Sequence, residues 1–88
     1  MNWKIEFSGD ARYALKKLDK PIQERIRKYV KNLRELSNPR MRGEALTGNL
    51  SEFWKYRVGD YRLICRIQDD KLIVLVVSIG HRSKIYRQ

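Results

Sequence analysis

Alternating hydrophobic and polar positions in the second half of the chain predict three consecutive β-strands. The alternation covers residues 53–58, 61–67 and 71–79, and a period of two places successive side chains on opposite faces of a sheet. Gly59-Asp60 and Asp69-Asp70 separate the three runs, and glycine at the first position of a two-residue turn favours type II′. The last run is rich in Val and Ile, so we expect it to be a central strand.

The first half of the chain begins with a short strand and continues with helical spacing. Apolar residues alternate over residues 3–7 and then recur every three to four positions over residues 10–18 and again from Pro21 to about Ser37. Proline suits the first turn of a helix, and Pro39 ends the second one. Residues 40–49 contain two glycines and mixed polarity, so we expect a loop there.

These elements predict an α+β fold with the order β-α-α-β-β-β. Each helix has one apolar face that must be covered, so both N-terminal helices should pack on one face of a small, mostly antiparallel, four-stranded sheet. The first strand would return beside the last. A chain of 88 residues is the length of one domain, which we assign to residues 1–88.

The excess of positive charge limits the classes of molecule that this chain is expected to bind. Twenty Lys and Arg oppose ten Asp and Glu, for a net charge of +10, and eleven of the twenty cations are Arg. Such a surplus on a small body is typical of proteins that bind a polyanion, and Arg is the better residue for bidentate phosphate contacts. Nucleic acid is therefore the favoured partner, with an anionic membrane, a very acidic protein or a simple solubility role as the alternatives.

Other classes are excluded or disfavoured by what the sequence lacks. Cys65 has no second cysteine to pair with, which fits a small core residue in a reducing cytoplasm. The N-terminus has no apolar signal-peptide region and the run from Leu72 to Val77 is too short to span a bilayer. One His and one Cys cannot form a zinc site of the usual ligand count, and there is no glycine-rich phosphate loop or Ser-His-Asp set, so we expect neither cofactor nor metal.

The alternation also gathers cations on one face of the predicted sheet. Lys55 and Arg57 share a face of one strand, and Arg62 and Arg66 share a face of the next. If the helices cover the opposite side, these four cations line the open side. Like charges across a sheet are destabilising, so the cluster predicts an anion site, the alternative being a solvated face with long basic stems.

A polar exit follows the last strand. His81 and Arg82 come directly after Gly80, and Tyr86 follows. His81 fits either an acid–base role or an ordinary exposed histidine. Tyr86 fits either base stacking or packing as a buried aromatic.

Taken together, these motifs resemble the RelE branch of the RelE/ParE toxin superfamily. The resemblance covers nearly the whole chain and is carried by Trp-Lys-Tyr-Arg-Val at 54–58, Tyr-Arg-Leu-Ile at 61–64, and Ile-Gly-His-Arg at 79–82 with Tyr86. Leu46-Thr47-Gly48 also resembles a loop of that family.

The resemblance implies the toxin of a type II toxin–antitoxin system, a metal-independent, ribosome-dependent endoribonuclease that cuts mRNA in the A site by attack of the 2′-OH. The implied catalytic residues are Lys55, Arg57, Arg62, His81, Arg82 and Tyr86. This chain has Lys-x-Arg where the family often has Lys-x-Lys, and arginine holds its proton too tightly to act as a base. Lys55 and His81 are therefore the candidate bases.

The implied partners are ribosomal RNA, mRNA and an acidic RelB-like antitoxin, with no membrane. Basic residues expected to contact RNA through salt-sensitive phosphate contacts are Arg12, Lys16, Lys17, Arg66, Lys84 and Arg87, and further cations on the helices and loop, Arg25, Lys28 and Arg40, are expected to hold ribosomal RNA. Two alternatives stay open: the ParE branch, which shares the fold but acts on DNA gyrase, and a non-catalytic nucleic-acid-binding remnant of a toxin.

Overall fold

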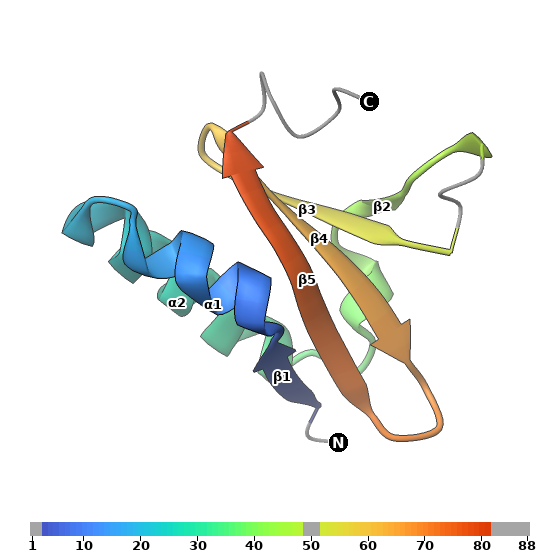
Figure 1. The fold of residues 1–88 in the computed structure, drawn as a ribbon. Coiled ribbons are helices and arrows are strands. Elements are labelled where there is room, and N and C mark those ends of the chain that lie inside the picture. The colour runs from blue at the N-terminus through green and yellow to red at the C-terminus, as the bar shows by residue number, and fades with distance from the viewer. Residues whose placement is uncertain (1–2, 49–51, 82–88) are drawn as a thin grey trace.

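The computed structural model describes residues 3–48 and 52–81 of the chain. Its elements, in chain order, are β1 (Lys4–Phe7), α1 (Gly9–Lys16), α2 (Lys20–Arg34), a 3₁₀ helix η1 (Pro39–Met41), β2 (Glu44–Ala45), β3 (Trp54–Val58), β4 (Tyr61–Gln68) and β5 (Ile73–His81) (Figure 1). The predicted α+β fold class and the order of the main elements are confirmed.

The sheet has five strands in the order β1-β5-β4-β3-β2. β1 runs parallel to β5, and the remaining neighbours are antiparallel. As predicted, the first strand returns beside the last, which makes β5 an interior strand. The additional strand, β2, lies in the segment that we predicted to be loop; two residues are too few to carry a readable alternation.

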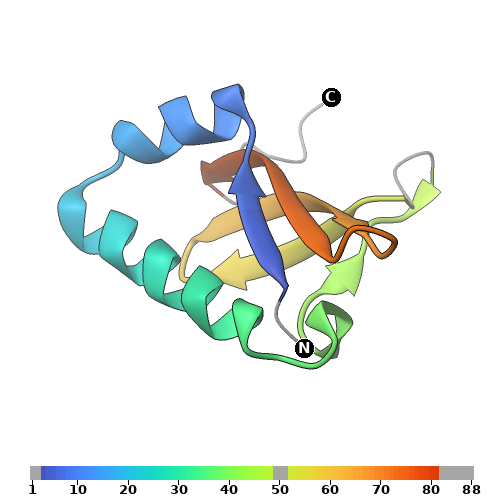
Figure 2. The ribbon, with the colours of Figure 1, turned by 90° about the horizontal axis from the view of Figure 1, so that it is seen from below.

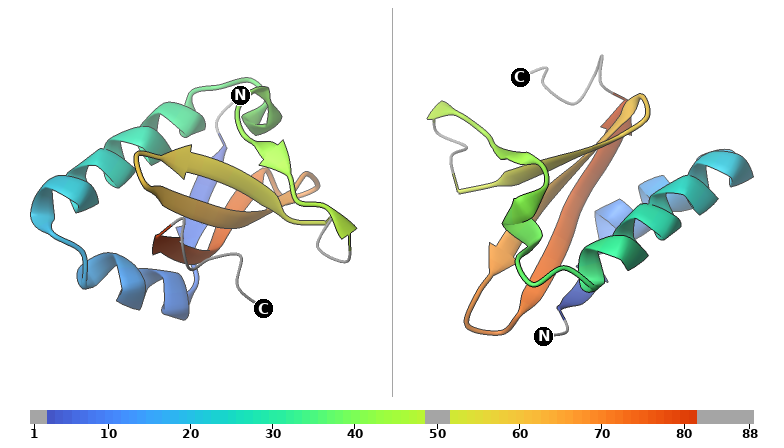
Figure 3. Two further views of the ribbon diagram at one scale, coloured as in Figure 1. Left: turned by 90° about the horizontal axis from the view of Figure 1, so that it is seen from above. Right: turned by 180° about the vertical axis from the view of Figure 1, so that it is seen from behind.

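Both helices lie on the same side of the sheet (Figures 2 and 3). Ser8 starts α1, because its Oγ accepts a hydrogen bond from the Ala11 amide at 3.1 Å and donates one to the Val77 carbonyl at 3.1 Å. α2 ends at Arg34, before the predicted end near Ser37, since the next two amides bond to carbonyls three residues back in a tightened final turn. The helices contribute Ala11, Leu15, Ile26, Val30 and Leu33 to the core.

The two hairpin turns differ from one another. Gly59 has φ of +61° and Asp60 does not have a positive φ, as the predicted type II′ turn requires. The second turn is longer than predicted: Leu72 adopts φ of +55°, and β5 begins at Ile73 instead of Lys71. The carbonyl of Leu72 accepts a hydrogen bond from the Lys4 amide at 2.9 Å, so this turn also fixes the start of β1.

The core between helices and sheet is formed by one face of each long strand. Tyr56 of β3, Leu63 and Cys65 of β4, and Val74 and Val76 of β5 are at most 1% exposed. Burial raises the pKa of the Cys65 thiol, which keeps it protonated and unreactive. The prediction that Cys65 is a core residue is confirmed.

Candidate catalytic site on the β3–β4 hairpin

The hairpin of β3 and β4 brings cations together on the sheet face opposite the core. Arg57 lies directly across from Arg62, and Lys55 lies across from Ile64. Residues paired in this way have Cβ atoms about 5 Å apart. Since Tyr56 and Leu63 pair on the core side, the predicted sorting of these strands into a core face and a basic face is correct.

Arg62 differs from the expectation that all four cations are openly exposed. It is only 7% exposed, and within the described part of the chain its Nε has no hydrogen-bond partner. One terminal nitrogen donates a long bond of 3.4 Å to the carbonyl of Tyr61. A buried cation with an unsatisfied donor is costly, so this guanidinium is suited to an incoming anion.

Lys55 is held by a carboxylate that the sequence pattern did not point to. Its Nζ lies 2.8 Å from Oε2 of Glu44, and its side chain is 16% exposed. The pKa of the Glu44 carboxyl is lowered, first by the hydrogen bond from Lys55, then by the charge of Lys55, with smaller contributions from Arg57 and Arg62. The positive charges of Lys55, Arg57 and Arg62 therefore all lower the pKa of Glu44.

Gly43 allows Glu44 to approach Lys55 so closely. Its φ is +78°, and a Cβ at this position would collide with the Lys55 carbonyl and lie 2.7 Å from Nε1 of Trp54. The indole Nε1 of Trp54 donates a bond of 2.7 Å to the Arg42 carbonyl. On the other side of Glu44, the Leu46 amide donates a bond of 3.1 Å to the Phe53 carbonyl. The short strand β2 is thus fastened to β3 on both sides of the Glu44–Lys55 pair.

These residues line a cavity of about 310 Å³, which we call the β3 cavity; its lining residues are Tyr29, Gly43, Glu44, Lys55 and Arg57. A second hollow of about 280 Å³ shares Tyr29 and Arg57 with it and adds Arg25 and Lys28 from α2. The cations that line the β3 cavity are therefore continued along α2 by further cations. Tyr29, which is half-buried, presents an aromatic side chain between the two hollows.

His81 does not lie with these cations. It pairs with Tyr61 across β4 and β5, and its ring makes an edge contact with the Tyr61 ring at 5.5 Å between centroids. Since paired residues share a face and Arg62 follows Tyr61 in the strand, the register puts His81 on the face opposite Arg62. Its acid–base role stays a prediction. Arg82, Lys84, Tyr86 and Arg87 lie outside the described residues.

The other predicted RNA-contacting residues are dispersed. Arg66 is exposed and lies 3.6 Å from Glu52, whereas Arg12, Lys16 and Lys17 lie on or just after α1, which packs against β5 and β1. Arg40 makes a two-bond ion pair with Asp69 at 2.8 and 2.9 Å. The structure therefore brings together Lys55, Arg57 and Arg62 but not these outlying cations.

Two residues at the cavity were missed by the sequence analysis. Glu44 stands in a segment without periodicity, and Tyr29 falls within the helical spacing of apolar residues from Pro21 to about Ser37, which predicts packing and not a site. The one sequence feature that could have indicated the role of Glu44 is the neighbouring Gly43, because glycine marks close backbone approach.

Among the described residues, no three of His, Cys, Asp and Glu gather as they would around a metal. No described helix is long and apolar enough to span a membrane.

With the fold and site described, comparison with known proteins identifies the class. Residues 5–86 match the family of ParE toxins of type II toxin–antitoxin systems. The chain therefore belongs to this family and, with the relatives below, to the RelE/ParE toxin superfamily.

The relatives and solved structures point to the RelE branch. The chain is 32% identical to Toxin RelG of Mycobacterium tuberculosis over all of both chains, and 30% identical to the mRNA interferase toxin RelE of Escherichia coli over all of this chain and 94% of that one. In structure it resembles a chain of the RelBE2 toxin–antitoxin complex of M. tuberculosis, with a TM-score of 0.84, 27% identity and coverage of 96% and 95% of the two chains. It also resembles an E. coli RelE mutant in the free state, with a TM-score of 0.79, 25% identity and coverage of 97% and 88%. The protein is a RelE-like toxin of a type II toxin–antitoxin system.

Proposed function

We propose that this toxin is a metal-independent endoribonuclease that cuts mRNA in the ribosomal A site in the cytoplasm. The observation that carries the proposal is the arrangement of Arg57 and Arg62 directly opposite one another, with Arg62 buried and its Nε unsatisfied. Two guanidinium groups side by side repel each other unless an anion lies between them. A phosphodiester supplies that anion and accepts several bonds from arginine.

The reaction on this site is attack of a ribose 2′-OH on the adjacent phosphorus. The 2′-oxygen–phosphorus bond forms as the 2′-OH gives its proton to a base, and the bond from phosphorus to the 5′-oxygen breaks as that oxygen takes up a proton. The products are a 2′,3′-cyclic phosphate and a 5′-hydroxyl. Negative charge accumulates on the phosphorane oxygens, where Arg57 and Arg62 would stabilise it. Donors fixed where charge develops are usually the largest catalytic contribution.

Proton transfer needs a base, and the cavity adds Glu44 to the candidates Lys55 and His81. An ion pair favours the charged forms of both partners, so Lys55 paired with Glu44 is suited to donate a proton or stabilise charge. When the phosphate draws Lys55 toward itself, the Glu44 carboxylate is left to accept the 2′-OH proton. We therefore assign the base to Glu44 and a cationic role to Lys55, with Arg82 and Tyr86 retained as catalytic residues on the strength of the family resemblance.

Substrate positioning would come from the aromatic and basic surroundings. Tyr29 at the cavity can stack on a splayed base, as aromatic residues do in single-stranded RNA recognition. Arg25 and Lys28 line the hollow that continues from the β3 cavity, where they would contact ribosomal or messenger phosphates. An acidic RelB-like antitoxin would neutralise the toxin, and the relatives of known structure include toxins bound to antitoxins.

The decisive experiment uses ribosomes programmed with a defined mRNA. The protein is added, and the mRNA ends are mapped by primer extension at low and high salt. Codon-phased cuts that require the ribosome, with cyclic phosphate at the new 3′ ends, are expected. Cuts in free mRNA at equal rate would refute the ribosome dependence.

Two further readouts separate the alternatives that share this fold. A DNA gyrase supercoiling assay tests the ParE-type activity, because a family match by itself does not fix the target. Inhibited supercoiling without mRNA cuts would assign the protein to that activity. Salt-sensitive RNA binding without any product would make it a non-catalytic binding protein.

A further inference from the structure

The strand that carries Glu44 is too short to fix its own position. β2 has two residues and pairs with β3 at two positions, whereas β4 has eight residues. Strands of fewer than three residues are below the usual length. The place of the Glu44 carboxylate therefore depends on the segments that flank β2.

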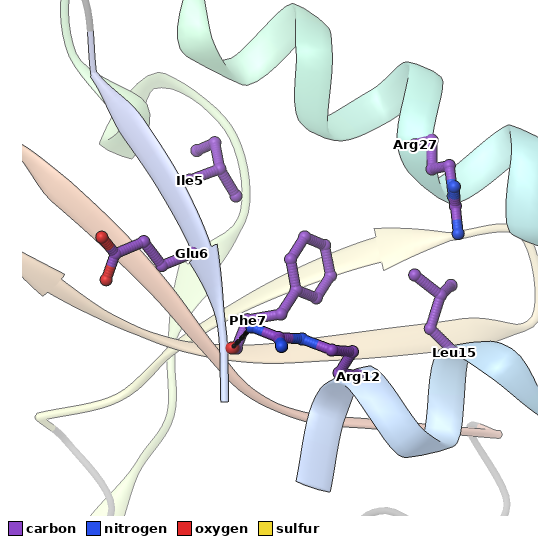
Figure 4. A pocket seen from close by; sticks show the side chains of 6 residues that line it. All are labelled: Ile5, Glu6, Phe7, Arg12, Leu15 and Arg27. Carbon is purple, nitrogen blue, oxygen red and sulfur yellow. Dashed lines mark hydrogen bonds between the residues drawn. The ribbon is translucent and has the colours of Figure 1, made fainter. Parts of the chain in front are cut away.

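A hollow lined by cations does not by itself contain a carboxylate, as the space along β1 shows (Figure 4). That hollow, of about 540 Å³, is lined by Arg12 and Arg27 beside apolar residues. Glu6 also borders it, but its side chain points to the other side of β1. The placement of Glu44 among the cations of the β3 cavity therefore needs a local structural cause.

The 3₁₀ helix η1 lies two residues before β2 and is bonded to β3 at its start and just after its end. The Tyr56 hydroxyl donates a bond of 2.8 Å to the carbonyl of Pro39, the first residue of η1. The Trp54 indole donates a bond of 2.7 Å to the carbonyl of Arg42, which follows η1. The chain that leads from η1 to Glu44 is thus short and held along its length.

The guanidinium of Arg40 joins η1 to the turn between β4 and β5. Its two terminal nitrogens donate bonds of 2.8 and 2.9 Å to the two carboxylate oxygens of Asp69. Its Cζ lies 6.0 Å from the centre of the Trp54 ring, and its amide donates a bond of 2.9 Å to Oδ1 of Asn38. Two parallel bonds orient a planar guanidinium as well as hold it, so the position and the direction of Arg40 are both fixed.

We propose that Arg40 and Asp69 are positioning residues for Glu44: their ion pair fixes η1, and η1 places β2 so that the Glu44 carboxylate meets Lys55. The inference rests on the proposed function, in which Glu44 is the base. The side chains of the pair are 38% and 62% exposed, and exposed ion pairs contribute little to global stability. Their effect is expected in geometry, because a displacement of about 1 Å can slow a reaction by about 10²-fold.

The charged groups around Glu44 make its titration a measure of its position. Lys55 and Arg57 of β3 and Arg62 of β4 all lower its pKa, and Tyr29 of α2 lines the same cavity. The three cations act in one direction. A displacement of β2 away from them therefore raises the pKa of Glu44.

The first test measures the pKa of Glu44 by carboxyl-carbon NMR in the whole chain, without RNA or ribosomes. Asp69→Asn removes the ion pair and keeps the shape of the side chain. The loss of this negative charge would by itself lower the pKa of another carboxyl. Loss of the contact with Lys55 would raise the pKa of Glu44, because the bond from Lys55 is the main cause of its low value. We expect a rise, which has the opposite sign to the direct effect of the removed charge.

Three further variants accompany Asp69→Asn. Asp70→Asn is the matched control, because it removes the same charge from the same turn, and it should not raise the pKa of Glu44. Asp69→Glu keeps a carboxylate for Arg40 and should keep the pKa of Glu44 low. Arg40→Lys keeps the charge but not the two parallel bonds, so the pKa of Glu44 should rise. Thermal unfolding checks that each variant remains folded.

The second test measures single-turnover mRNA cleavage on programmed ribosomes as a function of pH. We expect Asp69→Asn to slow cleavage by about tenfold, because the base is displaced but not removed. The acid side of the pH profile should move to higher pH together with the pKa of Glu44, since a base acts in its deprotonated form. Asp70→Asn should match the wild type in rate and in pH profile.

The two tests separate this inference from the proposed function. A pKa of Glu44 that is unchanged or lower in Asp69→Asn would overturn the inference, as would an equal rise in Asp70→Asn. If the wild-type chain cuts no mRNA while the pKa of Glu44 rises in Asp69→Asn, the proposed function is wrong and the positioning of Glu44 stands. If the wild type cuts and the pKa of Glu44 does not rise, the function stands and the positioning role is wrong.

Discussion

Lys55 and Glu44, which both line the β3 cavity, form an ion pair at 2.8 Å. The pair joins β3 to a two-residue strand and brings a carboxylate to a face that otherwise presents cations. We propose that this carboxylate is the proton acceptor beside the arginines that hold the phosphate.

The titration of Glu44 should reveal the pair directly. Its pKa is lowered chiefly by the hydrogen bond from Lys55, so carboxyl-carbon NMR should give a value below the usual one for Glu. A carboxyl with a lower pKa in the folded state adds stability above its unfolded pKa and loses that contribution as pH falls through the folded value. Lys55→Met should move the pKa of Glu44 back up and leave that of Asp69, which is lowered by Arg40, unchanged.

Glu44→Gln should slow mRNA cleavage by about 10²-fold, because the proposed base is removed while shape is kept. Lys55→Ala should slow cleavage about as much. The double variant should slow cleavage by clearly less than the product of the two single effects, since paired groups act together. Single-turnover cleavage on programmed ribosomes measures this. Glu52→Gln, next to Arg66, is the control for loss of one acidic residue. Cleavage by Glu44→Gln at the wild-type rate would rule out Glu44 as the base.

Arg62→Leu should reduce mRNA cleavage without reducing the stability of the fold. Replacing a buried cation whose Nε is unsatisfied by an apolar side chain is neutral or stabilising, by about 1 kcal/mol, whereas loss of a phosphate-binding guanidinium should reduce cleavage by about 10²-fold or more. Urea unfolding and the ribosome assay measure the two effects. Lys71→Leu, in the exposed β4–β5 turn, is the control. A large loss of stability in Arg62→Leu would mean that this arginine is structural.

Gly43→Ala should disrupt the attachment of β2. The new Cβ would meet backbone and side-chain atoms of β3, and alanine is also strained at a positive φ. Gly48 has a similar φ of +66° but nothing within 4 Å of a Cβ, so Gly48→Ala isolates the backbone strain. We expect Gly48→Ala to cost about 1 kcal/mol and Gly43→Ala clearly more, together with a rise in the pKa of Glu44. Equal effects of the two substitutions would contradict the close packing at Gly43.

Tyr56→Phe should destabilise the fold without a change in charge. The Tyr56 hydroxyl donates a bond of 2.8 Å to the buried Pro39 carbonyl, and burial raises the pKa of the Tyr56 phenol, which keeps this donor protonated. Loss of the bond leaves a buried carbonyl unsatisfied, at a cost of about 1–2 kcal/mol. Urea unfolding measures the change. Tyr13→Phe, at an exposed position, should leave stability nearly unaltered; an equal loss there would show that the hydroxyl–Pro39 bond is not the cause.

The pattern of hydrophobic and polar positions was enough to predict the fold class and to predict which residues lie on each face of β3 and β4. Tyr56 and Leu63 alternate with Arg57 and Arg62 in the sequence, and the structure buries the first pair in the core and aligns the second pair across the strands. The start of β5 was predicted two residues early, since Leu72 adopts a left-handed turn conformation that apolar character does not reveal.

The sequence by itself determined which residues share a strand face, because side-chain direction alternates with chain position. It also determined the excess of positive charge. The tertiary structure decided that Glu44 meets Lys55, that Tyr29 lines the β3 cavity, and that His81 lies on the face opposite Arg62. These relations depend on strand register and on contacts between segments far apart in the chain, and local periodicity carries no information about either.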